Sequence, residues 1–162
     1  MLLIWIELII LCGLFWGICY LGTGTDEKNI KSYYSYPDDA QNIVKANPKL
    51  NSKIKPYKPL VSFISNLIMF LVILFVFGFF IKSNTYLNNL INILLLGQIL
   101  NLFDFLVIDI LWWRNSSRVR FTGTENKPEL YSNPKKHFLS FIKGCVMFLI
   151  VAIIDGLLLT VI

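Results

Sequence analysis

The sequence lacks the short motifs that mark the common catalytic and nucleotide-binding sites. It contains no H-E-x-x-H, no Walker-type glycine loop, no G-x-G-x-x-G and no Ser-His-Asp order. It has one histidine, and its three cysteines form no C-x-x-C pair. Because these thiols lie in apolar stretches, we interpret Cys12, Cys19 and Cys145 as small packing residues. The sequence therefore predicts no metal site and no cofactor, and it favours a protein that is not an enzyme.

Charge is scarce as well: only 15% of the 162 residues are charged, whereas 56% are hydrophobic. The hydrophobic residues gather in four long blocks instead of the short periodic runs of a soluble domain. At 1.5 Å per residue, a helix of about 20 residues spans the roughly 30 Å hydrocarbon core of a bilayer. We therefore predict an all-α, polytopic membrane protein, a four-transmembrane-helix bundle with two short cytoplasmic loop regions. The predicted single integral membrane domain covers 1–162, with transmembrane helices at 2–21, 60–81, 87–113 and 138–162.

The first of these helices differs from a cleaved signal peptide. No Lys or Arg precedes its apolar run, and no A-x-A site follows it. We therefore expect a retained transmembrane helix. Gly13 and Gly17 form a G-x-x-x-G spacing, which places two small residues on one helix face and lets a neighbouring backbone approach closely. This spacing predicts a helix-packing face, either within the chain or toward another one.

Basic residues concentrate in two of the three predicted loops. Loop 22–59 holds seven lysines against four acids, and loop 114–137 holds six Lys or Arg against two acids. The third link carries only Lys82, so the positive-inside rule places both long loops in the cytoplasm and both termini outside. The formal charge of +5 thus predicts topology and contact with anionic headgroups, and no binding of nucleic acid. Richness in Ile, Asn, Lys and Phe favours the plasma membrane of a bacterium.

Short elements are predicted inside both loops. Pro37-Asp38-Asp39 suits the start of a helix that continues to Ala46 and is stopped by Asn47-Pro48. That helix is too short to stand alone in water, so we expect it to lie on the membrane or on the bundle. Residues 118–121 alternate like a short strand, which Thr122-Gly123 could turn back. Aromatic anchors at the headgroup level are predicted for Tyr33, Tyr34, Tyr36, Trp112 and Trp113.

The third helix carries polar side chains that would be costly against lipid. Gln98, Asn101 and Asp104 follow one another at three-residue steps and share a stripe, whereas Asp109 is rotated from Asp104 by about 140°. Lys143 is the one basic residue embedded in a predicted span. We favour a neutralising ion pair between Lys143 and one of the two acids. The alternative is a proton- or cation-linked site built from these acids and amides, because one acid would remain unpaired.

Two further groups of charged residues lie near the predicted membrane surfaces. Glu7 and Asp155 form an acidic pair at similar depth near the outer face. They could share a proton or line an outer opening, but we favour solvation at the interface. A basic collar on the cytoplasmic side could hold a phosphate-bearing headgroup or an acidic protein surface, although we favour a role in topology alone. Its members are Arg114, Arg118, Arg120, Lys135, Lys136 and His137.

Three functions follow from these features. The leading prediction is a small non-enzymatic subunit or accessory component of a membrane complex, which associates through its helix faces and its cytoplasmic collar. Its partners would be other copies of the chain or a larger membrane complex. A small oligomeric transporter or ion-conducting protein that uses Asp104 and Asp109 is the alternative, since four helices leave little room for alternating access in one chain. A phospholipid-headgroup enzyme with its site at the cytoplasmic face is the third.

Overall fold

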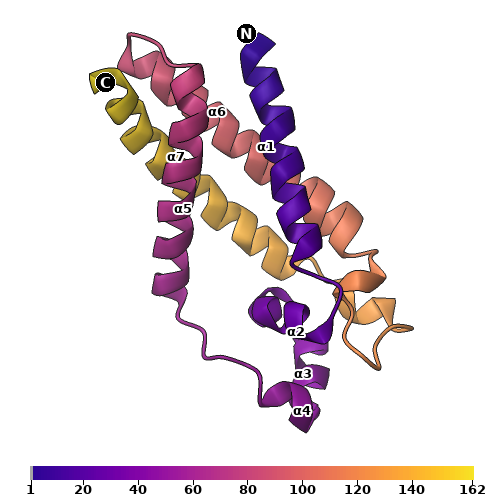
Figure 1. Cartoon of the computed structure of the whole chain (residues 1–162). Helices are drawn as coiled ribbons and strands as arrows, with labels where there is room; N and C mark the ends of the chain where they lie inside the picture. Colours follow the sequence, from indigo (N-terminus) through magenta and orange to yellow (C-terminus); the bar gives the residue numbers. More distant parts are fainter. Residues whose placement is uncertain (1) are drawn as a thin grey trace. The chain divides into compact units, whose positions relative to one another are not determined.

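The structure is a computed structural model that describes residues 2–162 (Figure 1). Helices make up 79% of the chain, and the described residues form no strand. Four helices are long and apolar enough to cross a membrane. The all-α prediction is therefore confirmed, and the chain has the helices of a membrane protein. These four are α1 (Leu2–Leu21), α5 (Pro59–Phe80), α6 (Tyr86–Phe103) with its π-helical continuation η2 (Asp104–Trp113), and α7 (Lys135–Val161).

The chain divides into two compact units. Unit 1 comprises the described residues up to Gly13 together with Lys58–Phe103 and Phe141–Ile162. Unit 2 comprises Leu14–Tyr57 and Asp104–Ser140. Unit 1 thus contains α5, α6 and parts of α1 and α7, whereas unit 2 contains both predicted cytoplasmic loops and η2.

Small residues bring the helices of unit 1 together. A Cβ added to Gly156 of α7 would lie 3.0 Å from both the Cα and the N of Leu90 in α6, so the two backbones approach closely here. A Cβ on Gly97 of α6 would lie within 3.0 Å of the Phe148 side chain of α7. Phe148 also packs edge-on against Phe70 of α5, with 4.8 Å between ring centroids. Glycines and one aromatic pair therefore define the packing of α5, α6 and α7.

Unit 2 is built around an aromatic core. Tyr33, Tyr36, Phe121 and Tyr131 are each about 1% exposed, and Trp113 is 7% exposed. The anchor prediction is therefore wrong for Tyr33, Tyr36 and Trp113, because their rings bury one another. Only Tyr34 of the three tyrosines is well exposed. The short helices around this core are α2 (Asp26–Asn29), η1 (Ile30–Ser35), α3 (Asp38–Ala46), α4 (Pro48–Asn51), η3 (Ser117–Val119) and η4 (Pro128–Tyr131).

Helix α3 confirms the predicted short helix over Asp38–Ala46. The two acids of its first turn suit the positive end of the helix dipole, and Asn47 leaves helical geometry with φ −90° and ψ 109°. Its buried residues Ala40 and Val44 belong to the core of unit 2. Packing in a folded core, which was not foreseen, therefore supports this short helix.

The strand predicted at 118–121 is wrong. The carbonyl oxygen of Arg118 accepts hydrogen bonds from the Gly24 amide at 3.0 Å and from Asn29 Nδ2 at 3.0 Å. The carbonyl oxygen of Val119 accepts one from the Tyr36 hydroxyl at 2.8 Å. Side chains and a turn of the first loop therefore bind the carbonyl groups that a sheet partner would have bound, and the segment folds as η3 instead.

Candidate functional site

The amide groups of the predicted polar stripe bind α6 to α7 within unit 1. Gln98 Nε2 donates a hydrogen bond to the Cys145 carbonyl at 2.9 Å, and Asn101 Nδ2 donates one to the Phe141 carbonyl at 3.1 Å. Any side chain at Gly144 would collide with the Asn101 amide, so this glycine leaves room for it. Two of the three stripe residues therefore have a structural role between helices.

The π-helix changes the expected geometry of the two acids in unit 2. The Arg114 amide donates to the Asp109 carbonyl at 3.2 Å, which is the i to i+5 bond of a π-helix. Residues five apart therefore complete one hydrogen-bonded turn, so the predicted rotation of about 140°, which assumed α-helical geometry, does not apply to Asp104 and Asp109. π-Helical segments often mark functional sites, which makes η2 the main candidate region of unit 2.

The Asp109 carboxylate lies at hydrogen-bonding distance from His137. Its Oδ1 lies 2.9 Å from His137 Nδ1, and the side chains of His137 and Asp109 are 8% and 14% exposed. The imidazole packs edge-on against Trp113, with 4.6 Å between ring centroids. Nδ1 points at the carboxylate, and Nε2 is buried without a hydrogen-bond partner among residues 2–162. The Asp109 carboxylate therefore orients the imidazole through Nδ1 and leaves Nε2 without a bond.

This pair revises the expected partner of Asp109. The sequence predicts that Lys143 pairs with either Asp109 or Asp104, but in the structure His137 of the basic collar lies at the Asp109 carboxylate. Lys143 is exposed on the unit 1 portion of α7, and the proposed pairing of Lys143 with Asp104 stays a prediction. His137 was not considered for this role because the sequence does not show that η2 and the start of α7 pack together.

Most members of the basic collar bind groups of unit 2 itself. Arg118 donates to the carbonyls of Tyr20 at 3.3 Å and Thr23 at 3.2 Å, and its guanidinium carbon lies 3.9 Å from the Tyr20 ring centroid. Arg120 donates from Nη1 to the Glu125 carbonyl. Lys135 and Arg114 have no side-chain partner within the described part of the chain. The collar is therefore only partly available to a headgroup or an acidic protein.

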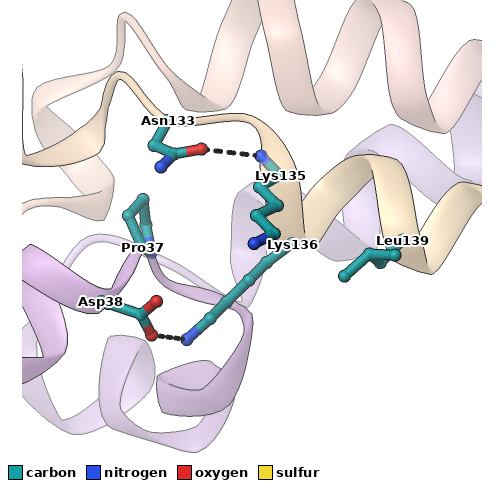
Figure 2. Close-up of a pocket in the computed structure, with 6 residues that line it drawn as sticks. All are labelled: Pro37, Asp38, Asn133, Lys135, Lys136 and Leu139. Atoms are coloured by element: carbon teal, nitrogen blue, oxygen red, sulfur yellow. Dashed lines mark hydrogen bonds and ion pairs between the residues drawn. The ribbon is translucent and has the colours of Figure 1, made fainter.

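Figure 2 shows the pocket that contains the two lysines of the collar. Its volume is about 100 Å³, and it lies where the first turns of α3 and α7 meet in unit 2. Lys136 Nζ reaches Asp38 Oδ1 at 2.7 Å, and this bond lowers the pKa of the Asp38 carboxyl. Asn133 Oδ1 accepts a hydrogen bond from the Lys135 amide at 3.0 Å and caps the start of α7. One lysine is neutralised, so the pocket is a weak site for an anion.

The outer acids, Glu7 and Asp155, are both buried in unit 1. They are 5% and 1% exposed, so the favoured account, solvation at the interface, is wrong for the chain as folded here. Both carboxylate oxygens of Glu7, and Oδ2 of Asp155, have no hydrogen-bond partner among the described residues. The structure therefore gives no hydrogen bond through which Glu7 could share a proton.

The G-x-x-x-G face of α1 is open. A Cβ added to Gly13 or Gly17 would meet nothing within 4 Å. Gly13 lies about 200° around the helix from the buried Leu11, two residues earlier. It lies about 140° around the helix from the buried Leu8, five residues earlier. Gly13 therefore faces away from the buried residues of α1, and a Cβ at Gly17 likewise has open space around it.

The cysteines form no further site, and the described residues contain no cluster of potential metal ligands. Cys12, Cys19 and Cys145 are free and half-buried, and Cys145 Sγ accepts a hydrogen bond from Asn101 Nδ2 at 3.4 Å. Within residues 2–162, no three side chains of His, Cys, Asp or Glu are grouped so that they could hold a metal ion. The thiols are best described as packing groups of the long helices.

Asn89 is a buried, hydrogen-bonded residue that the sequence analysis does not identify. It is buried at the start of α6, where its amide donates to the Ser83 carbonyl at 2.9 Å and to Thr160 Oγ1 at 3.0 Å. Asn92 donates to the Ile81 carbonyl at 3.2 Å. The three-residue spacing of these asparagines was the available signal, since it places both on one helix face.

Comparison with known proteins does not assign a function to the chain, so the functional argument rests on the geometry described above. No protein-family model matches the chain, and no curated protein or solved structure matches it significantly.

Proposed function

We propose that this chain is a small non-enzymatic subunit of a membrane complex. In this proposal it resides in the plasma membrane of a bacterium, with both termini outside and with 22–59 and 114–137 in the cytoplasm. The excess of Lys and Arg in these two segments supports that orientation. Its partners are anionic headgroups and the other membrane-spanning chains of that complex, which can include further copies of this chain beside a second protein, and no nucleic acid.

The open glycine face of α1 carries the proposal. A neighbouring group of the same chain occupies the space beside each of four buried glycines, Gly78, Gly97, Gly144 and Gly156. No such group lies within 4 Å of a Cβ added to Gly13 or Gly17. Only 17% of the apolar window of α1 is buried, against 44% for the fourth span. A small-residue face that no helix of its own chain covers suits close approach by a helix of another chain.

The use of polar side chains inside the chain supports a role other than catalysis. Gln98 and Asn101 join two helices, and Asp109 binds His137. Arg118 and Arg120, which a headgroup enzyme would need for phosphate, bind carbonyl groups of unit 2. A subunit needs an exposed face for its partner, and the open surroundings of Gly13 and Gly17 support such a face on α1.

The test compares three tagged proteins purified from their native membrane in mild detergent. We expect the wild type to retain a second protein and the Gly13→Leu/Gly17→Leu variant to lose it. Because both glycines face open space, this variant should keep the wild-type folded yield and unfolding midpoint. Ile18→Phe adds bulk to an exposed position about 140° from Gly13 and is the matched control, which should retain the partner. Retention of the partner by the double variant would contradict the proposal.

The Asp109–His137 pair favours a second candidate function. An imidazole oriented by a carboxylate, with Nε2 buried and unpartnered, suits passage of a proton in an oligomeric transporter or channel. This function predicts that Asp109→Asn keeps the folded yield and abolishes proton or solute flux in proteoliposomes. Unchanged flux in that variant would exclude it.

A further inference from the structure

Glu7 is an unusual group in an apolar surrounding. Glu7 lies in the second turn of α1, and only 5% of its surface is exposed. Neither carboxylate oxygen has a hydrogen-bond partner within residues 2–162. Asp155 also has one buried oxygen without a partner, but among the described residues only Glu7 has both oxygens buried and unpartnered.

A groove of about 310 Å³ in unit 1 has Glu7 in its wall. The rest of the wall is apolar and belongs to α1 and α5. These residues are Leu3, Ile6, Ile10, Val76, Phe77 and Phe80. Glu7 is therefore the only polar side chain of the groove, and the volume is within the range that holds a small organic molecule.

Neither protonation state of Glu7 is satisfied by the chain alone. An ionised carboxylate in an apolar wall loses its hydration and gains no counter-ion. A protonated carboxyl avoids the charge, but its O–H donor and its carbonyl oxygen both remain without a partner. A cation that carries N–H donors removes both deficits, because it supplies the opposite charge and the hydrogen bonds together.

We propose that this groove binds a lipophilic ammonium ion, with Glu7 as its counter-ion. The ammonium group donates to the Glu7 carboxylate, and the hydrocarbon body fills the space between α1 and α5. Phe77 and Phe80 suit the cationic end as well, because aromatic rings attract ammonium groups. The site is independent of the assembly face, since Gly13 and Gly17 are not among the residues of its wall.

Calorimetric titration of the full chain in nanodiscs of zwitterionic lipid tests the site, with empty nanodiscs as the blank. The probe is hexylamine, and hexanol is its neutral counterpart. We expect saturable binding of hexylamine and no saturable binding of hexanol. Glu7→Gln should weaken hexylamine binding at least about tenfold, because a charge-assisted hydrogen bond is lost. Asp155→Asn, a buried acid outside the groove, should leave it unchanged.

A second variant protects the result against loss of fold. Val76→Phe keeps Glu7 and fills the groove from an exposed position, so it should also weaken hexylamine binding while the unfolding midpoint stays unchanged. Equal binding of amine and alcohol, or equal binding by wild type and Glu7→Gln, would overturn the proposal. The proposal would also be overturned if the wild type did not bind hexylamine and Glu7→Gln lost a protein that co-purifies with the wild type. That result would show that the carboxylate binds a side chain of a partner protein.

Discussion

In unit 2, the buried polar side chains bind other groups of the chain, whereas unit 1 leaves a carboxylate with no bond at all. Tyr36 binds the Val119 carbonyl at 2.8 Å, Gln41 binds the Tyr36 carbonyl at 2.9 Å, and Tyr131 lies 2.6 Å from Thr124 Oγ1. In unit 1, by contrast, both oxygens of Glu7 lack partners. Unit 2 therefore binds its buried polar side chains within itself, apart from single nitrogens of Arg118, Arg120 and His137, whereas unit 1 leaves the whole Glu7 carboxylate unpaired.

The same contrast holds for packing. The core of unit 2 is aromatic, with ring pairs such as Tyr36 and Trp113 at 4.9 Å between centroids. Unit 1 relies on glycines that let helices approach, and it leaves wide apolar faces open, with only 11% of the apolar window of α5 buried. Lipid chains can cover an exposed apolar face, but they offer no hydrogen bond or counter-ion to a carboxylate. The unpaired Glu7 therefore indicates that something other than lipid, either a partner chain or a ligand, binds in unit 1.

The largest effect should come from breaking the Asp109–His137 pair of unit 2. Asp109→Leu leaves the buried His137 Nδ1 without its partner, and leaving a buried polar group unsatisfied lowers the free energy of unfolding by about 3 kcal/mol. Titration with SDS of the purified protein measures this change. Lys143→Met is the control and should have little effect, because Lys143 is exposed. A larger loss in Lys143→Met than in Asp109→Leu would show that Asp109 depends on the lysine.

A similar loss in unit 1 should follow from Gly156→Leu. The added side chain meets the backbone of Leu90, which cannot move aside as a side chain can, so α6 and α7 must separate. Overpacking of this kind costs about 3 kcal/mol. Gly13→Leu makes the same chemical change in open space and should leave the SDS midpoint unchanged. Equal effects of the two variants would contradict the packing described for unit 1.

Tyr36→Phe should have a smaller effect on unit 2. It removes one buried hydrogen bond and leaves the Val119 carbonyl unpaired, at a cost of about 2 kcal/mol. Burial raises the pKa of Tyr36, so its contribution is complete below the ordinary pKa near 10 and is lost as the pH rises above it. We therefore expect the stability of the wild type to fall above that pH more steeply than the stability of Tyr36→Phe. Parallel alkaline curves would contradict this role.

The smallest effect should come from the exposed ion pair shown in Figure 2. Asp38 is 82% exposed in its side chain, and water and salt screen its bond to Lys136. Because this bond lowers the pKa of Asp38, its contribution is present above the ordinary pKa of 3.8 and is lost as the pH falls below it. Asp38→Asn should therefore match the wild type within the error of the SDS titration at neutral pH. A clear loss would show that the pocket supports unit 2.

The sequence predicted the long helices well because 20 apolar residues in a row have few other uses. It predicted α3 from its proline, its first-turn acids and Asn47-Pro48. It did not predict the core of unit 2, because tyrosines beside a membrane span have the same pattern whether they face headgroups or one another. The strand at 118–121 was wrong for a related reason: alternation does not show that Tyr36 and Asn29 bind the backbone there.

The candidate site was predicted only in part. Gln98, Asn101 and Asp109 were singled out as polar groups that must face protein. Their partners, Cys145, Phe141 and His137, lie 47, 40 and 28 residues further along the chain. Pairing across such a distance depends on how the helices pack, which periodicity does not report. The π-helix could not be foreseen either, because hydrophobic blocks without a clear stripe do not distinguish i to i+4 from i to i+5 bonding.

The most direct test of the central proposal is the mass and composition of the wild-type particle after mild extraction from its native membrane. The account predicts a particle larger than the 18.7 kDa chain that contains a second protein in fixed ratio. Recovery of the chain as a monomer, or as an oligomer of this chain only, would contradict it.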